Sequence, residues 1–405
     1  MRSNPPIARR ARSARSLANS AKVLSAVRKN ATKVGLDELS ASNVAKLCGL
    51  STGSIYSRFE DTDEIAIALW EQVIREPFKQ RLQRGVDYIY KSNSAGLSIN
   101  EEVTFKADFE NPDELSKLGV EFLVVAKRNN LIGEVVIPEV SQWFNEFGLN
   151  QNNTEINNAS VALGLSASIG TALRSLITKT NPNWHFIAKW ISSAIDQTIP
   201  LPTPPDLPVP RVVEFVTDNP VRTALINSVA EVIANSGYAR ATVSRILRRA
   251  NLKNGSLYNL YENKEDLIND ALNLLLSIET DTNHESNRLA SLESPSDRGL
   301  ANNFKLGLLP ERQKWNNFRL ECLIASRNHL PIRNKFNRLL ETSQDNLAKI
   351  SPDLPRETIN FFASATQAVG LGFTTLDLFT DQLPRCDFYS IMTKLSEQIR
   401  LLSNS

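Results

Sequence analysis

The feature that most constrains the fold of this chain is a pattern of residues that occurs twice, 202 positions apart. Residues 35–65 align with residues 237–267 without a gap, and seven of the 31 aligned pairs are identical. Many of the remaining pairs keep their chemical character, as where Phe59 aligns with Tyr261. Because internal repetition at this scale indicates one structural unit used again, the chain is predicted to contain two similar units.

An amphipathic helix is predicted in front of each copy. The same offset superimposes two sets of apolar residues that recur at every fourth position: Val23, Val27 and Ala31 in the first copy and Leu225, Val229 and Ile233 in the second. Residues spaced in this way lie on one face of an α-helix. Elsewhere apolar residues also recur at every third or fourth position, and strand-like alternation is hard to find. We therefore expect an all-α fold.

Within each copy the residues predict two short helices joined by a tight turn. In the second copy Thr242 can cap the first of these helices, with Ile246 and Leu247 facing inward. The turn requires a residue that accepts a left-handed backbone, which is Gly49 in the first copy and Asn251 in the second. The following helix starts with small polar residues and a glycine, so its first turn can approach base edges and phosphates closely.

The runs Leu50–Phe59 and Leu252–Tyr261 resemble the DNA-binding signature of the tetracycline-repressor (TetR) family. Both copies have the spacing of that family. This holds for the amphipathic helix, the glycine at its end, the capped helix, the turn and the start of the next helix. The resemblance implies two tandem TetR-like units. In each unit, a three-helix helix-turn-helix (HTH) domain would be followed by a helical domain for ligand binding and dimerisation.

The resemblance and the composition together predict six segments. They are a basic N-terminal arm (1–13), a first HTH domain (14–76), a first helical C-terminal domain (77–199), a proline-rich linker (200–211), a second HTH domain (212–276) and a second helical C-terminal domain (277–405). The first 36 residues hold nine Lys or Arg residues and no Asp or Glu, which suits an arm that neutralises phosphates or enters a minor groove. Six prolines between Pro200 and Pro210 favour an extended connector.

The family resemblance also assigns DNA-binding roles by position. The predicted base contacts come from the first turn of the third helix of each unit: Ser51, Thr52, Lys253 and Asn254. Arg58 and Asn259 are expected to assist them. Phosphate contacts fall to a second set: Ser40, Ser54, Tyr56, Thr242, Ser256, Tyr258 and Lys264. Arg245 is expected to add general electrostatic support. The chain departs from the family pattern at Thr62, where a lysine is usual, and at Asn251 and Leu260, so one half is expected to bind more weakly.

Catalysis and metal binding are not expected. The three histidines and three cysteines are scattered: His185, His284, His329, Cys48, Cys322 and Cys386. Their spacing fits neither a metal site nor a nucleophile with its base, so we expect no metal and no cofactor. Cys322 is expected to be a core residue, with an oxidant-sensing thiol as the alternative. No apolar run approaches the roughly 20 residues of a membrane helix, so we expect a cytoplasmic protein that does not contact membranes.

The predicted function is that of a DNA-binding transcriptional regulator, with a repressor favoured. Its partners would be a double-stranded DNA operator and an unidentified small-molecule inducer, whose pocket cannot be recognised from ordinary apolar residues. Ala159–Thr178 and Ile359–Thr380 are predicted to pair, which would make the chain an internal pseudo-dimer, and a homodimer of two chains is the alternative. The rival functions are a ligand-sensing or scaffold protein that has lost DNA binding and a helical enzyme.

Overall fold

Every described element of the chain is a helix or a turn. The computed structural model describes residues 14–93, 97–178, 183–202, 215–253, 255–275, 298–350 and 354–403. These ranges contain no β-strand, which confirms the all-α prediction for them. Within the same ranges, no helix has both the length and the apolar character needed to cross a membrane. The predicted basic arm (1–13) and most of the predicted linker (200–211) lie outside the described residues.

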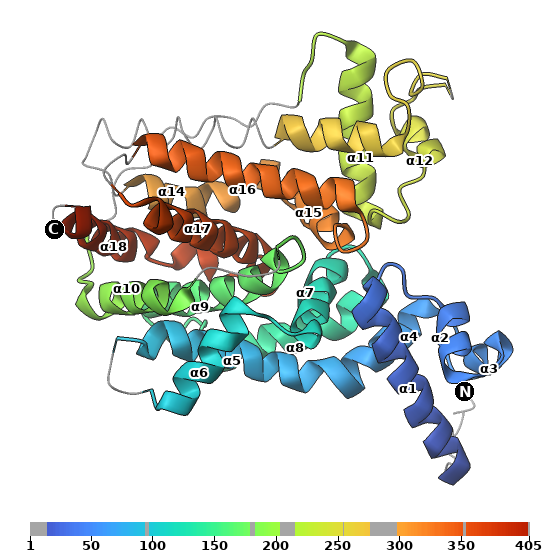
Figure 1. Cartoon of the computed structure of the whole chain (residues 1–405), viewed down its shortest axis with the longest axis horizontal. Helices are drawn as coiled ribbons and strands as arrows, with labels where there is room; N and C mark the ends of the chain where they lie inside the picture. Colours follow the sequence, from blue (N-terminus) through green and yellow to red (C-terminus); the bar gives the residue numbers. More distant parts are fainter. Residues whose placement is uncertain are drawn as a thin grey trace, which may run out of the picture.

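The segments predicted as HTH domains, 14–76 and 212–276, are called the first and the second HTH segment below. The first contains four helices, drawn in blue in Figure 1. Their bounds are α1 Ala14–Val34, α2 Ala41–Cys48, α3 Thr52–Tyr56 and α4 Thr62–Leu69. Val23, Val27 and Ala31 on α1 are buried, so the predicted apolar stripe is confirmed. The helix α1 packs against both α2 and α4, and this packing fixes the position of the short helices that follow it.

The second HTH segment repeats most of this arrangement. It contains α11 (Pro220–Ser236), α12 (Val243–Arg249) and a helix over residues 264–275. The predicted stripe is again buried: Leu225, Val229 and Ile233. Residues 255–260, however, form consecutive turns, so the regular helix predicted there is wrong. The equivalent residues of the first copy form α3 although they also include a glycine, Gly53, so neither the length of the segment nor its glycine explains the difference.

The first HTH segment continues into longer helices without a break. The helix α4 passes through the π-helical turn η1 (Trp70–Ile74) directly into α5 (Arg75–Lys91), so the predicted domain boundary between residues 76 and 77 falls inside a helix. Trp70, Ile74 and Phe78 are all buried and keep the helical spacing across this point. The remaining helices of this half are α6 (Ile99–Glu110), α7 (Glu114–Ala126), α8 (Asn130–Glu146), α9 (Glu155–Arg174) and α10 (Trp184–Gln197).

A similar set of helices follows the second HTH segment. It comprises α14 (Arg298–Gly307), α15 (Pro310–Ala325), α16 (Leu330–Ile350), α17 (Arg356–Leu376), the 3-10 turn η2 (Leu383–Arg385) and α18 (Phe388–Ser403). Figure 1 shows the two sets stacked on each other, with both HTH segments at the same end of the molecule.

The predicted pairing of two helices late in each half is confirmed, since α9 packs along α17. Both helices end four residues earlier than predicted, because residues 175–177 and 377–379 form turns. The two backbones nearly touch: a Cβ on Gly170 would lie 1.7 Å from the carbonyl oxygen of Ala368, and one on Gly372 would lie 1.9 Å from that of Ser166. Residues 166 and 368, like 170 and 372, are 202 positions apart. The contacts are therefore reciprocal, as at a two-fold axis.

The helices α10 and α18 complete a four-helix core with α9 and α17. They pack against each other, and each also contacts the axis helix of the other half. The reciprocity is not complete, because Arg174 on α9 is buried and donates to the side-chain oxygens of Gln367 (3.0 Å) and Ser364 (3.2 Å) on α17. The equivalent residue of the other half, 202 positions later, is Leu376, whose side chain cannot donate a hydrogen bond.

The close approach of α9 and α17 predicts opposite effects for two neighbouring substitutions. Gly372→Ala is expected to destabilise the protein by about 1–3 kcal/mol, because the new methyl group would overlap the backbone at Ser166. Gly370→Ala is the matched control on the same helix, since a Cβ there has no atom within 4 Å. It should be neutral or stabilising by up to about 1 kcal/mol. Urea unfolding followed by circular dichroism measures both, and equal effects would contradict the close packing.

Candidate nucleic-acid interface

In the first HTH segment the turn between α2 and α3 has the geometry that the sequence predicted. The Ser40 side chain caps α2 by accepting from the backbone N–H of Asn43 (3.2 Å). Gly49 ends α2 with a left-handed backbone (φ 63°, ψ 37°), and its N–H returns to the carbonyls of the last turn. Leu50 packs against the core at the corner. These contacts fix the direction in which α3 leaves the turn.

The short helix α3 presents a polar, solvent-facing surface. Ser51 caps it by accepting from the N–H of Ser54 (3.1 Å), while Ile55 is fully buried and anchors it. Thr52 is exposed, and Tyr56 is 54% exposed, so this tyrosine is not a core aromatic. Arg58 is half-buried and donates from Nη1 to the Ser54 hydroxyl (2.9 Å), which holds the serine that the sequence assigns to a phosphate.

The corresponding turn of the second HTH segment uses different residues for the same geometry. Thr242 caps α12 by accepting from the N–H of Arg245 (3.4 Å), as predicted. Asn251 takes the left-handed conformation at φ 55°, the one positive φ of a non-glycine residue in the described chain. Ile246 and Leu247 are buried beneath the turn, and the N–H of Leu252 donates to the carbonyl of Leu247 (2.9 Å). Asn tolerates this conformation better than most residues.

The predicted DNA-contacting residues that follow are largely solvent-facing. Lys253 and Asn259 are exposed, Ser256 is half-buried, and Tyr258 is 61% exposed. Leu257 is buried and anchors the segment, as Ile55 does in the first one. Asn254, predicted to contact a base, lies outside the described residues.

Charge is distributed differently over the two segments. In the first, Glu60, Asp61, Asp63 and Glu64 flank Thr62 at the start of α4, and three of these carboxylates recur in the second as Glu262, Glu265 and Asp266. In the second, Lys264 holds the matching position, and its ammonium lies 4.5 Å from the centre of the Tyr238 ring. Arg245 and Arg248 on α12 are exposed, whereas Arg249 is paired with Glu231 on α11. The second segment is therefore the more cationic surface.

The two HTH segments meet at a buried cluster of charged residues that the sequence did not predict. Arg128, in the turn after α7, donates from Nε to Glu321 on α15 (2.6 Å) and from Nη2 to Asp37 in the loop after α1. The same guanidinium lies under Gly237, at the end of α11, where a Cβ would come within 2.6 Å of it. Gly237 has φ 80°, which a side chain would also disfavour. Arg128 thus contacts both HTH segments.

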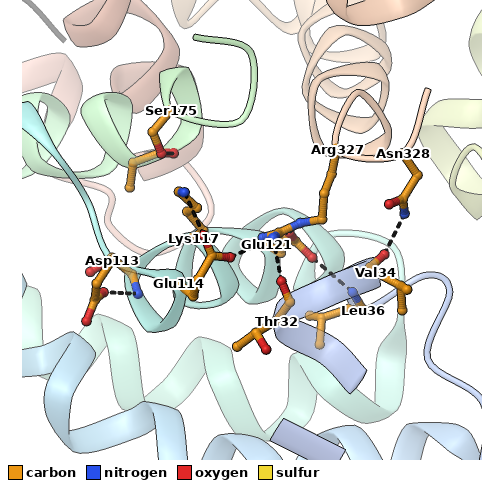
Figure 2. Close-up of polar contacts among 12 residues, drawn as sticks. Thr32, Val34, Leu36, Asp113, Glu114, Lys117, Glu121, Ser175, Arg327 and Asn328 are labelled. Carbon is orange, nitrogen blue, oxygen red and sulfur yellow. Dashed lines mark hydrogen bonds and ion pairs between the residues drawn. The ribbon is translucent and has the colours of Figure 1, made fainter. Parts of the chain in front are cut away.

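A second arginine, which belongs to the second half of the chain, binds residues of the first half (Figure 2). Arg327, in the turn after α15, donates from Nε to Glu121 on α7 (2.8 Å) and from Nη1 to the carbonyl of Thr32 at the end of α1 (3.1 Å). Glu121 in turn accepts from the N–H of Leu36 (2.9 Å). Asn328 beside it donates to the carbonyl of Val34 (2.6 Å).

We call Asp37, Glu121, Arg128, Glu321 and Arg327 the charged junction. Burial raises the pKa of Glu321 to about 8, and the Arg128 guanidinium opposes that rise. Burial likewise raises the pKa of Glu121. The available sequence signal was the similarity of residues 126–131 to residues 325–330, which places the two arginines at equivalent positions. Glu121 and Glu321 carry no such signal, because each is on a helix of the half opposite to its arginine, and Asp37 is in a loop.

The second HTH segment also matches a known protein family. The family model is described as bacterial regulatory proteins, tetR family, and its match covers residues 225–271, from α11 to the helix over residues 264–275. The chain therefore carries a TetR-type HTH domain there, a domain typical of DNA-binding transcriptional regulators. The match does not include the first HTH segment. No curated protein sequence shows significant similarity to the chain.

The described cysteines and histidines lie in the core or pair with other groups, and His284 lies outside the described residues. Cys48 and Cys322 are buried, and burial raises the pKa of the Cys322 thiol well above its ordinary value, which disfavours the oxidant-sensing alternative. His185 contacts Glu102 (2.6 Å), and His329 packs on the Tyr238 ring. Among the described residues, no group of three His, Cys, Asp or Glu side chains could hold a metal ion.

The left-handed conformation of Asn251 predicts that its substitutions will rank by backbone preference. Asn251→Ala should destabilise the second HTH segment by about 1–2 kcal/mol, because alanine pays the full steric cost of this conformation. Asn251→Gly should leave its stability unchanged or increase it, since glycine has no Cβ. Thermal unfolding of the two variants measures the difference. A stable alanine variant would mean that the turn does not need a left-handed residue.

Proposed function

We propose that this chain is a transcriptional regulator that contacts one DNA operator through both HTH segments and is released by a small ligand. The observation that carries the proposal is the TetR-type domain at residues 225–271, with Lys253, Tyr258 and Asn259 exposed just after its turn. Side chains at this place of an HTH are the ones that enter the major groove. We favour repression, because a ligand that displaces such a domain from an operator frees the promoter.

The inclusion of the first HTH segment is supported by its geometry. It has a capped second helix, a left-handed turn at Gly49 and an exposed face with Ser51, Thr52 and Tyr56, each matching a feature 202 residues later. It has Thr62 and Asp61 where the second segment has Lys264 and Asn263, which leaves it one cation poorer and one carboxylate richer at that point. We therefore propose that the first segment binds its half-site more weakly than the second.

We further propose that one chain serves as the pseudo-dimer that places two HTH segments on one duplex. The reciprocal contacts of Gly170 and Gly372 support this, because they reproduce within one chain the arrangement expected of a symmetric dimer interface. The rival function, a ligand-sensing protein without DNA binding, would leave the exposed tyrosines and Lys253 without a role.

For the ligand, we propose a recess among α5, α6 and α7. Its volume is about 100 Å³, and Arg81, Arg84, Asp108 and Asp113 are among its lining residues. The Arg81 side chain is 1% exposed, its Nε has no hydrogen-bond partner, and burial lowers its pKa to about 10. Both Nη atoms of Arg81 already donate to Asp108, Ser168 and Thr171, so Nε is the donor that a ligand oxygen would satisfy.

The first test is binding to the DNA upstream of the gene that encodes the chain, a common target of self-regulating repressors. Mobility shift and footprinting should show two contacted major grooves on one face, about one helical turn or a small multiple apart. The two half-sites should differ in sequence, because Ser51 and Thr52 correspond to Lys253 and Asn254. Protection of one short half-site would contradict the use of both segments, and absence of binding would favour the ligand-sensing alternative.

The second test separates phosphate contacts from base contacts by their dependence on salt. Lys264→Ala should weaken binding to specific and random duplexes alike and make the logarithmic salt slope shallower by about one unit. Thr62→Ala should leave the slope unchanged, whereas Thr62→Lys should steepen it by about one unit. Asn254→Ala should change base preference at its half-site and leave the slope nearly intact. If Lys264→Ala leaves the slope unchanged and Thr62→Ala reduces it, the assignment by position is wrong and the first segment is the stronger electrostatic anchor.

A further inference from the structure

We infer that Arg128 and Arg327 are positioning residues that hold the two HTH segments at a fixed distance, and so select the spacing between DNA half-sites. The fixed distance is a property of the free protein. Only its consequence for half-site spacing rests on the proposed function.

Arg128 connects the two HTH segments directly. Its guanidinium is paired with Asp37 of the first segment and lies in contact with Gly237 of the second. The carboxylate of Asp37 would itself lie 2.9 Å from a Cβ on Gly237, so the two loops are in van der Waals contact. A weaker ion pair between Arg240 and Asp63 (3.7 Å) adds a second link between the segments.

Arg327 connects the first HTH segment to the opposite half of the chain. It lies in the turn between α15 and α16 and binds the end of α1 through the carbonyl of Thr32, while Glu121 holds the rest of its guanidinium. Glu121 also binds the N–H of Leu36, so the last turn of α1 is held from both halves. A movement of the first segment would have to break contacts in both halves.

Burial makes the charged junction rigid at four of its five residues, while the side chain of Asp37 is 25% exposed. The side chains of Glu121 and Glu321 are each 2% exposed, that of Arg128 is 3% exposed and that of Arg327 is 10% exposed. Water cannot replace a lost partner at such a position, so separating the ions is strongly unfavourable. A guanidinium also holds its partners in a planar, directional geometry. The two HTH segments are therefore coupled through one set of contacts.

The distance between the segments can be measured without DNA. Nitroxide labels on Ser42→Cys and Ser244→Cys, two exposed positions 202 residues apart, report it by pulsed electron paramagnetic resonance in a Cys386→Ser background. The wild-type junction should give one narrow distance distribution. The double variant Glu121→Gln/Arg327→Gln removes both charges without leaving a buried ion unpaired, and its distribution should broaden.

Two further variants serve as a matched control and as an alternative to the double variant. Lys79→Gln/Glu146→Gln neutralises an ion pair between α5 and α8 (2.7 Å) that does not involve the HTH segments, and it should leave the distribution narrow. Asp37→Asn changes one partly exposed residue and provides the same test if the double variant does not fold. A narrow, unchanged distribution in a folded junction variant would overturn the inference.

DNA binding then tests whether the charged junction selects the spacing between half-sites. On duplexes whose half-sites are moved apart in single base-pair steps, the preference of the wild type for its best spacing over its worst should fall by about tenfold in the junction variant. Binding to an isolated half-site should stay the same. An unchanged spacing preference with a broadened distance would overturn the role in spacing selection. If the wild type binds no duplex, the proposed function fails, while the distance measurement still decides the positioning role.

Discussion

The backbone contact between α9 and α17 is the constraint on which the rest of the structure depends. Because Gly170 and Gly372 have no side chain, the two helices approach until backbone meets backbone, and this single approach sets the relation between the two halves. The helices α10 and α18 then cover the pair, and the halves share one core. Everything farther from this axis, including the place at which the two HTH segments meet, is positioned by it.

The buried residues of the charged junction have a different role, at the end of the molecule where the HTH segments lie. Apolar packing would hold the HTH segments against the helical core with little directional preference, whereas Arg128 and Arg327 accept only a few geometries. Burying such ions costs stability compared with apolar residues of the same size. The cost is consistent with a requirement for one defined arrangement, since the same arginines link segments that lie hundreds of residues apart in the chain.

The sequence predicted those features that depend on neighbouring residues. The buried stripe of α1, the cap at Thr242 and the left-handed turns at Gly49 and Asn251 follow from local chemistry, and the structure confirms them. The pairing of α9 with α17 could be predicted because the family resemblance implies two paired helices, and these two stretches are apolar with small residues that permit close approach. The carboxylate partners of the charged junction could not, since ion pairs between distant helices leave no periodic pattern. The turn structure of residues 255–260 also escaped prediction, since the equivalent residues of the first copy do form the helix α3.

The buried Arg174 shows what a covalent link between two halves permits. In a homodimer every contact across the axis occurs twice, so a buried cation would need the same partners on both sides. Here Arg174 meets Gln367 and Ser364, and the position related to it holds Leu376. In a single chain a substitution changes one half, whereas in a homodimer it changes both subunits. The two sides of the core can therefore change independently and become complementary without being identical. A chain of this kind can acquire unlike halves that no pair of identical subunits could combine.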